Sequence, residues 1–286
     1  MAKLIKVVTF LAALVAMQQP ALAEKPYSFN VLNHRSVALT AQYWNPILGY
    51  VSQKSGVPLE LQLNKTSKEN TAKAETGMYD FLYTNHFFTP ERDRLGYRVI
   101  ARVAGPGIRG QVVVAADSAI RDLRELDAKE VAFPTPDGFT GYLLPMDALL
   151  SSGVRVKTVI TGNQEASIGL LRREEVSAAG VNSAVMEHFS RRMGFQYRVL
   201  WSSPLYHDLC VMVNPRIPKA KAALVKAALV GMSKDPQGRK ILEAGAELLK
   251  IDDEPGFVSA DNRDYDSYRA FYKHSRVRTG SPTKVE

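Results

Sequence analysis

Residues 131–145 read VAFPTPDGFTGYLLP, and this stretch decides the fold class. Its first three residues form an apolar run that is typical of a buried strand, and the pattern of 140–150 predicts a helix. Proline and glycine interrupt regular structure in the loop between the two segments. A strand that leads directly into a helix is half of a βαβ unit, so the stretch predicts a layered α/β domain.

The same alternation of short apolar runs and amphipathic segments continues on both sides of this stretch. We expect strands at 27–32, 59–63, 81–83, 98–103, 111–116, 131–133, 156–160, 178–181, 197–201 and 209–213. We expect helices at 40–55, 67–76, 140–150, 164–172, 183–191, 219–232 and 236–244. Gly56 and Asp235 are residue types that end and begin helices. This order predicts mixed, mostly parallel sheets with helices on both faces.

Two breaks divide the series into two lobes. The first is GPG at 105–107, and the second is SSP at 202–204. We therefore expect 24–106 and 205–286 to form one lobe and 107–204 the other, joined by two hinge crossovers. Aromatic residues at helical spacing near the C-terminus predict a helix docked on a lobe, with no binding role; they are Tyr265, Tyr268, Phe271 and Tyr272.

The first 23 residues have the features of a secretory signal peptide. Lys3 and Lys6 precede an apolar stretch, which is shorter than the roughly 20 residues that span a bilayer. Ala-Leu-Ala at 21–23 matches a cleavage site, so we expect a mature periplasmic chain that begins at Glu24. The single cysteine, Cys210, cannot form an internal disulfide, and its apolar surroundings predict a core position.

The composition is that of a globular protein. Of the 286 residues, 45% are hydrophobic and 23% are charged, which excludes a disordered, collagen-like or coiled-coil chain. The net charge is +8, yet no run of Lys and Arg exceeds two residues. Nucleic-acid binding is therefore less favoured than a uniformly basic surface or a small anionic ligand.

Loops at the carboxyl ends of the expected strands contain the candidate ligand-binding residues. Open α/β sheets bind ligands at this edge, where the positive ends of helices favour anions. Backbone N–H groups at Thr140 and Gly141, a cationic Arg35 and one protonated histidine are the expected anion donors, and aromatic rings are the expected walls. A solvent-exposed Arg35 and aromatic rings buried in the core remain the alternative. The full set is His34, Arg35, Tyr83, Asn85, His86, Phe139, Thr140, Gly141, Gln164, Asn182 and Tyr206.

Five segments, spread over nearly the whole mature chain, occur together in a recognisable order: FNVL with YWNP at 29–46, YDFLYTN at 79–85, VVV with DS and LREL at 112–126, the block 131–145, and WSSPL at 201–205. In these segments the sequence resembles the periplasmic substrate-binding proteins of phosphonate and phosphite ABC transporters. The resemblance implies a type II periplasmic binding fold with two lobes that close by hinge motion. It also implies delivery of a small ligand to an ABC permease in the inner membrane.

The candidate site differs from the family's pattern. The family has three consecutive hydroxyl residues that donate to the oxyanion, whereas this chain has Gly138, Phe139 and Thr140 there. The glutamate that meets an aminoalkyl ammonium in some members corresponds to Gln164 or has moved to Glu165, and the expected aspartate near Asn182 is not evident. The resemblance therefore implies a phosphonate-like or phosphite-like oxyanion, but not a standard aminoalkylphosphonate site.

Other function classes are less favoured. A metal site formed by His34, His86 and His207 lacks the usual ligand spacing. The sequence has no nucleophile elbow and no glycine-rich phosphate loop, so we expect no enzyme. A sensor subunit that presents its bound form to a membrane histidine kinase or cyclase stays open. We expect a monomer with no cofactor, no metal and no nucleic-acid partner.

Overall fold

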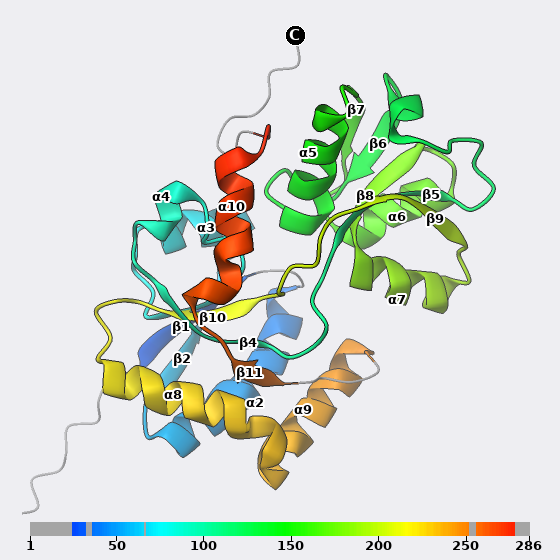
Figure 1. Ribbon diagram of the computed structural model, residues 1–286. Helices are drawn as coiled ribbons and strands as arrows, with labels where there is room; N and C mark the ends of the chain where they lie inside the picture. Colours follow the sequence, from blue (N-terminus) through cyan, green and yellow to red (C-terminus); the bar gives the residue numbers. More distant parts are fainter. Residues whose placement is uncertain (1–24, 33–35, 66, 252–255, 278–286) are drawn as a thin grey trace, which may run out of the picture.

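The computed structural model describes residues 25–32, 36–65, 67–251 and 256–277 and contains two sheets (Figure 1). The predicted signal peptide, His34 and Arg35 lie outside the described residues. The first sheet has the order β11-β4-β10-β3-β1-β2, with β1 (Tyr27–Val31), β2 (Leu59–Gln62), β3 (Phe81–Thr84), β4 (Arg98–Val103), β10 (Cys210–Val213) and β11 (Phe257–Ser259). The second has the order β7-β6-β8-β5-β9, with β5 (Gly110–Ala115), β6 (Glu130–Phe133), β7 (Lys157–Ile160), β8 (Ala178–Asn182) and β9 (Tyr197–Ser202).

Most strands of each sheet run in one direction, which confirms the predicted mixed, mostly parallel sheets. In the first sheet β10 and β11 oppose the common direction of β1 to β4. In the second sheet only β5 opposes the others. Strands β5 and β10 are the first strands after the two crossovers. Each of them enters its sheet antiparallel to the strands on both sides.

Helices cover both sheets, and all the predicted helices are present. Around the first sheet lie α2 (Val37–Ser55), α3 (Ser67–Glu75), α4 (Pro90–Asp93), α8 (Lys219–Gly231), α9 (Pro236–Leu249) and α10 (Asp266–His274). Around the second lie α5 (Leu144–Ser151), α6 (Gln164–Arg172) and α7 (Ser183–Met193). Gly56 ends α2 with φ of 68°, and the Asp235 carboxylate accepts from two N–H groups at the start of α9, as predicted. The prediction missed α4 and β11, which are too short to produce a period.

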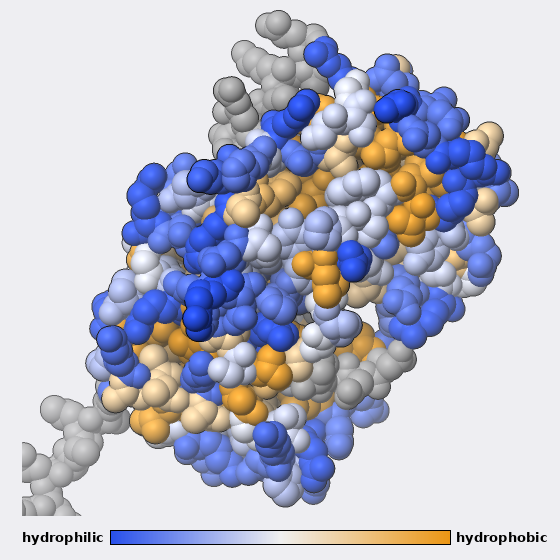
Figure 2. Space-filling view, viewed as in Figure 1, coloured by the Kyte–Doolittle hydropathy of each residue, from blue (hydrophilic) through white to orange (hydrophobic). Residues whose placement is uncertain are grey.

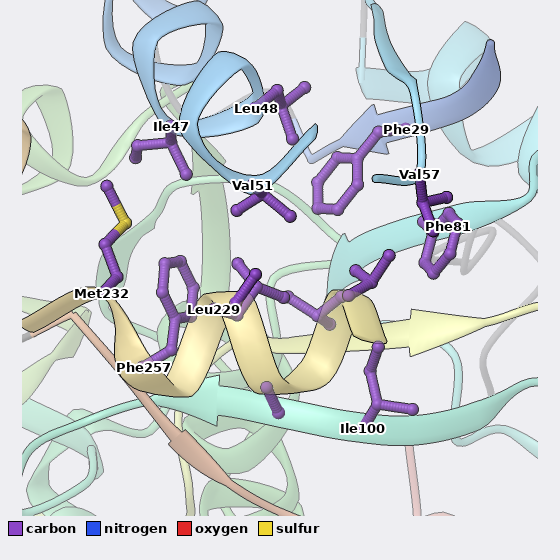
Figure 3. Packing of buried hydrophobic residues seen from close by; sticks show 14 of the residues in the cluster. Phe29, Ile47, Leu48, Val51, Val57, Phe81, Ile100, Leu229, Met232 and Phe257 are labelled. Atoms are coloured by element: carbon purple, nitrogen blue, oxygen red, sulfur yellow. The ribbon is translucent and has the colours of Figure 1, made fainter. Parts of the chain in front are cut away.

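The core of the first lobe lies between the sheet and the helices α2 and α8 (Figure 3). Phe29 of β1 packs on Trp44 of α2 and on Phe81 of β3, with ring centroids 5.3 Å and 6.1 Å apart. Leu229 of α8 and Val51 of α2 belong to the same cluster. Because these residues come from both ends of the chain, the segment after the second crossover completes this lobe.

The second lobe has apolar layers on both faces of its sheet. Val112 and Val114 of β5 belong to the cluster that includes Leu149 of α5, whereas Val113 belongs to the cluster that includes Ile168 of α6. Successive side chains of a strand point to opposite faces, so a continuous run of valine supplies both layers. This is the pattern of a strand that is buried on both sides.

The two crossovers run side by side. Ile108 and Tyr206 exchange backbone hydrogen bonds of 2.8 Å and 2.9 Å between nitrogen and oxygen. Gly107 has φ of 94°, and a Cβ atom there would lie 2.5 Å from the Tyr206 carbonyl oxygen. Only glycine fits this close approach. The lobe limits at 107 and 204 stay a prediction. All strands of the second sheet, from the start of β5 to the end of β9, lie between these limits.

Among the described residues, no helix is long and apolar enough to cross a bilayer. Figure 2 shows a surface that is largely hydrophilic, with hydrophobic patches between the polar regions. The exposed large apolar side chains belong to different segments: Val37, Met78, Ile160, Met193, Val199, Leu205 and Leu224.

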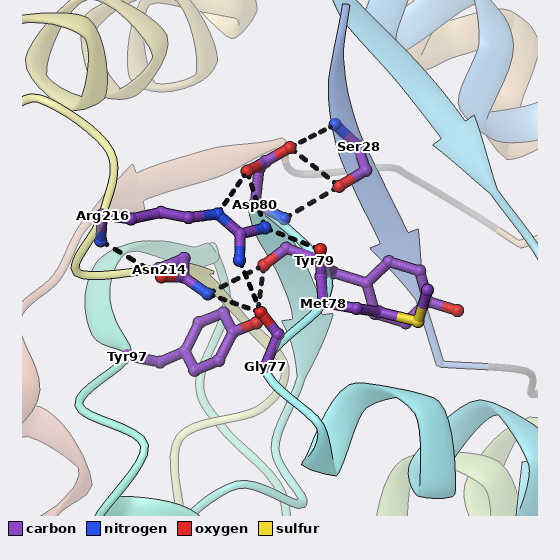
Figure 4. A network of polar contacts seen from close by, with 8 residues as sticks. All are labelled: Ser28, Gly77, Met78, Tyr79, Asp80, Tyr97, Asn214 and Arg216. Atoms are coloured by element: carbon purple, nitrogen blue, oxygen red, sulfur yellow. Dashed lines mark hydrogen bonds and ion pairs between the residues drawn. The ribbon is translucent and has the colours of Figure 1, made fainter.

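A polar network joins the chain before β3 to the segment after β10 (Figure 4). Asn214 donates to the carbonyl oxygens of Gly77 and Tyr79 at 2.9 Å and 3.1 Å. Arg216 forms an ion pair with Asp80, 2.8 Å between Nη2 and Oδ1. Buried carbonyl groups need such partners, so this network stabilises the first sheet.

Replacing Asn214 with alanine tests this role. Asn214 is 6% exposed. We expect Asn214→Ala to lower the free energy of unfolding by about 1–3 kcal/mol, because it removes the two hydrogen bonds that the buried Asn214 amide donates to the Gly77 and Tyr79 carbonyl groups. Arg216 and Tyr97 still donate to these two carbonyl groups. Urea unfolding measures this change. The control, Asn45→Ala at an exposed position of α2, should change it by less than about 0.5 kcal/mol. Equal effects of the two substitutions would contradict the role of the network.

Candidate functional site between the lobes

A helix start lies on the edge of the second sheet that faces the first lobe. A π-helical turn, Phe139–Leu143, continues directly into α5, so the helix begins one residue before the predicted start. Cβ atoms at Gly110 and Gly180 would lie 2.8 Å from the Thr140 carbonyl oxygen and 2.6 Å from the Gly141 carbonyl oxygen. The two glycines therefore allow the first turn to rest on β5 and β8. The first N–H groups of a helix have no acceptor within it and favour an anion.

Three predicted residues form a polar cluster at this helix start. The Asn182 side-chain amide donates to the Thr140 hydroxyl at 3.2 Å, and the Asn182 backbone N–H donates to Gln164 Oε1 at 3.1 Å. Asn182 Oδ1 also accepts from the Ala184 N–H at 2.9 Å and caps α7. The carboxyl ends of β6, β7 and β8, which run parallel to one another, thus bring Thr140, Gln164 and Asn182 together.

Phe139 points away from this cluster into a group of aromatic rings. Its ring centroid lies 4.9 Å from that of Tyr206 and 4.2 Å, 5.2 Å and 5.8 Å from those of Tyr268, Phe271 and Tyr272. Phe139 is only 2% exposed. Two predicted residues, Phe139 and Tyr206, therefore lie together, but α10 supplies most of their aromatic neighbours.

The rings that α10 places around Phe139 were not predicted from the sequence. The aromatic spacing correctly predicted a docked helix, and the rings do pack on the first lobe. The spacing gave no sign that the same rings also meet Phe139 of the second lobe, because that contact joins residues far apart in the chain. Phe139, the one aromatic residue of the sequence 134–140, was the available signal.

Asn85 and His86 bring the first lobe to the same region. Both residues follow β3 and are buried. The Asn85 side-chain amide donates to the Tyr268 hydroxyl at 3.3 Å, and this hydroxyl donates to the His207 carbonyl oxygen at 2.6 Å. Tyr83 lies elsewhere, against Trp44 and Phe257, with centroids 4.6 Å and 6.4 Å away.

His86 is a neutral side chain in this region. It is 9% exposed, and its Nδ1 atom has no hydrogen-bond partner among the described residues. Burial lowers the pKa of His86 to about 4; the Asp137 charge opposes this shift and the Arg92 charge adds to it. Burial and Arg102 also lower the pKa of His207. His86 is therefore neutral at neutral pH, and the expectation of one protonated histidine among the anion donors stays a prediction.

The remaining candidates from the sequence are Cys210 and a metal site. Cys210 is fully buried, as predicted, and its thiol donates to the Thr84 carbonyl oxygen at 3.0 Å. No group of three His, Cys, Asp or Glu side chains that could hold a metal ion occurs in the described part of the chain.

Two hollows of about 560 Å³ lie away from the predicted residues. One is at the outer end of the second lobe, beside Lys129 and Lys157, and the other is between α2 and α9, beside Tyr43 and Ile241. No predicted site residue lines either hollow.

The sequence matches one protein family over residues 29–265, described as the periplasmic substrate-binding protein of a phosphonate ABC transporter. A search among curated proteins found no match.

Several solved structures share the fold. A binding-protein component of an ABC phosphonate transporter from Pseudomonas aeruginosa has a TM-score of 0.67 at 17% identity, covering 87% of each chain. A protein from Prochlorococcus marinus, solved in complex with methylphosphonate, has a TM-score of 0.69 at 16% identity, covering 87% of this chain and 97% of the other. A Xanthomonas citri protein bound to chloride has a TM-score of 0.71 at 15% identity, covering 86% and 97%. These matches show the type II periplasmic binding fold.

The buried neutral His86 predicts an acid-sensitive fold. Between pH 6.5 and about 4 the unfolded His86 binds a proton that the folded side chain does not, so stability falls as the pH is lowered through this range. Above pH 6.5 neither the folded nor the unfolded His86 side chain binds this proton, so His86 does not lower the stability there. At about pH 5 we expect a loss on the order of 2 kcal/mol.

Urea unfolding at about pH 7 and about pH 5 measures this loss. His86→Gln should remove most of it, because glutamine does not titrate. The part that remains includes the contribution of His207, whose pKa is also lowered. His274→Gln, at an exposed position of α10, serves as the control and should keep the wild-type decline. An unchanged decline in His86→Gln would contradict the assignment to His86.

Gly141 predicts a second, local test. A Cβ atom at this position would lie 2.5 Å from Gln164 Nε2 and from the Pro134 ring, so Gly141→Ala should displace the loop and lower the melting temperature. Gly49→Ala in α2 is the control, because its Cβ would meet nothing within 4 Å. This control should raise stability by about 0.5–1 kcal/mol. A neutral Gly141→Ala would contradict the close packing of the loop.

Proposed function

The chain belongs to the family of periplasmic substrate-binding proteins of phosphonate ABC transporters, and on that premise we propose that it captures a small phosphorus oxyanion between its lobes. Members of this family are transport proteins rather than enzymes, and they deliver small phosphonate ligands to an ABC permease. We further propose that this chain acts as a monomer in the periplasm after removal of residues 1–23.

The helix start at Phe139 is the observation that carries the proposal. Backbone N–H groups at Thr140 and Gly141 belong to its first turn, where the helix dipole favours negative charge. The Thr140 oxygen accepts from Asn182, which leaves the hydroxyl hydrogen of Thr140 to donate to a ligand. A buried anion needs several such donors, and neutral donors of this kind can hold an oxyanion.

Residues of the first lobe would complete the pocket. Asn85 and the neutral His86 follow β3, and His34 and Arg35 follow β1, which pairs with β3 in parallel. The ends of these two strands therefore belong to the same sheet edge. Tyr206 would border the ligand beside the crossover, whereas Tyr83 packs against Trp44 and Phe257 in the core of the first lobe.

The side chain of Gln164 argues against an aminoalkylphosphonate. Its oxygen accepts from the Asn182 N–H, and its amide carries no charge to balance an ammonium group. We therefore propose an oxyanion without a cationic substituent, such as phosphite or methylphosphonate. The family assignment favours delivery to a permease over the sensor alternative.

A ligand screen with a Thr140 variant tests the proposal. The mature protein, unfolded and refolded to remove bound ligand, is titrated with phosphite, phosphate, methylphosphonate, aminoethylphosphonate and sulfate in a thermal-shift assay. A ligand at a hundred times its Kd should add about 2.7 kcal/mol of stability. We expect a shift with phosphite or methylphosphonate and little with aminoethylphosphonate.

Thr140→Val should then weaken binding of the active oxyanion by more than about tenfold, because it removes a buried donor. Thr140→Ser keeps the hydroxyl and should bind within about threefold of wild type. Calorimetric titration measures both values. Equal affinity of the valine variant and the wild type would show that the helix start is not the anion site.

A further inference from the structure

The C-terminal segment 261–277 is firmly attached to the first lobe. The Arg269 guanidinium donates to both carboxylate oxygens of Asp93 in α4, at 2.8–3.0 Å. Tyr268 donates to the His207 carbonyl oxygen at 2.6 Å, and Tyr265 donates to the Asp208 carbonyl oxygen at 2.5 Å. Both tyrosines are fully buried, so the first half of this segment moves with the first lobe.

The end of the same segment is attached to the second lobe. The Ser275 hydroxyl and the Arg276 N–H both donate to Asp147 Oδ1 of α5, at 2.8 Å and 2.6 Å. Val277 packs against apolar residues of the second lobe's core. Figure 1 shows α10 standing between α4 of the first lobe and α5 of the second. The segment is therefore a third connection between the lobes, in addition to the two covalent crossovers.

Between these two attachments, α10 holds the candidate ligand loop. Phe139 stacks on Tyr268 with an interplanar angle of 24° and meets the edge of Phe271 at 85°. Phe139 directly precedes Thr140, so its position fixes the first turn of the helix. A hydroxyl residue at this position would make no such contact with α10.

Opening the cleft would have to break these contacts. Hinge opening moves one lobe relative to the other. Because α10 stays with the first lobe, opening separates Phe139 from its ring partners and Asp147 from Ser275 and Arg276. Buried rings would then be exposed to water, which is unfavourable.

We propose that segment 261–277 is a strap that keeps the lobes closed in the absence of ligand, with Phe139 as the positioning residue that links the strap to the ligand loop. The free protein is then mainly closed, and ligand enters or leaves when the strap releases Phe139. The strap controls the rate of exchange. Its effect on ligand exchange rests on the proposed function, whereas closure of the free protein does not.

Spin-label distances test the closure directly. Asn45→Cys in α2 and Glu187→Cys in α7 place labels at exposed positions on different lobes. Cys210 stays unlabelled, because it is fully buried and burial raises the pKa of its thiol. Pulsed electron–electron double resonance gives the distance distribution without ligand and with saturating methylphosphonate. With the strap intact, we expect one narrow distribution that methylphosphonate leaves unchanged.

Loosening the strap should open the free protein. Asp147→Ala with Phe271→Ala removes the polar contact with α5 and one of the three ring contacts between α10 and Phe139. We expect a broader distribution with longer distances. The variant Asp147→Ala with Phe271→Tyr keeps a ring at position 271 and should recover part of the closed population. Asp266→Ala is the matched control, since it removes an exposed acid of α10 that pairs only within the helix, and it should stay closed.

Exchange kinetics provide a second readout that a merely structural role would not change. Trp201 packs against the apolar cluster that contains Phe139 and Tyr268, and also against the core of the second lobe. Its fluorescence should therefore report on closure. We expect both association and dissociation of methylphosphonate to become about tenfold faster when the strap is loosened.

The outcomes separate this inference from the proposed function. A free wild-type protein with long distances that shorten only with methylphosphonate would overturn the strap, and so would an unchanged distribution in the loosened variant. If the free protein is closed, the loosened variant opens, and no oxyanion binds either of them, the strap stands and the proposed function fails.

Discussion

The close contact between the helix start at Phe139 and the second sheet is the constraint on which the rest of the site depends. Gly110 and Gly180 lack the Cβ atoms that would collide with the carbonyl oxygens of Thr140 and Gly141. The first turn can therefore lie on the sheet edge, which directs its N–H groups toward the first lobe. The same placement sends the ring of Phe139 outward to α10. The proposed anion site and the proposed strap thus share one turn of helix.

The side chains that we propose as ligand groups around this turn are neutral, and this is the basis of the ligand that we propose. The charges of Asp137 and Arg92 act on His86 from outside this set. Thr140, Gln164 and Asn182 bond to one another, and burial keeps the His86 side chain uncharged at neutral pH. In a poorly hydrated site, the partial positive charge of a helix end and a few fixed donors can balance a small anion. A cationic substituent would find no opposite charge at Gln164. The departures from the family's hydroxyl loop therefore favour a small, uncharged substituent.

Aromatic packing replaces hydroxyl donors at one position of the loop, and this exchange has a mechanical consequence. Phe139 joins the rings of α10 and Tyr206, and α10 is itself fixed to Asp93 of the first lobe and Asp147 of the second. In a binding protein with only two crossovers, contacts with the ligand supply most of the preference for the closed state. In the proposed strap, contacts within the chain contribute to the same preference, and closure and ligand binding would then be less tightly coupled.

The sequence by itself determined the fold and the position of the helix start. Short apolar runs, the helix-ending Gly56 and the capping Asp235 are local signals, and the strands and helices that they predict are present. Local signals also placed Thr140, Gln164 and Asn182 at strand ends, because the end of a strand can be read from the chain. Only the tertiary structure decided the protonation of His86 and the second contact of α10. Both depend on atoms brought together from distant segments: the burial around His86, and the meeting of Phe139 with Tyr268, Phe271 and Tyr272. Side-chain spacing within one helix shows which face is apolar, but it does not show how many partners that face will meet.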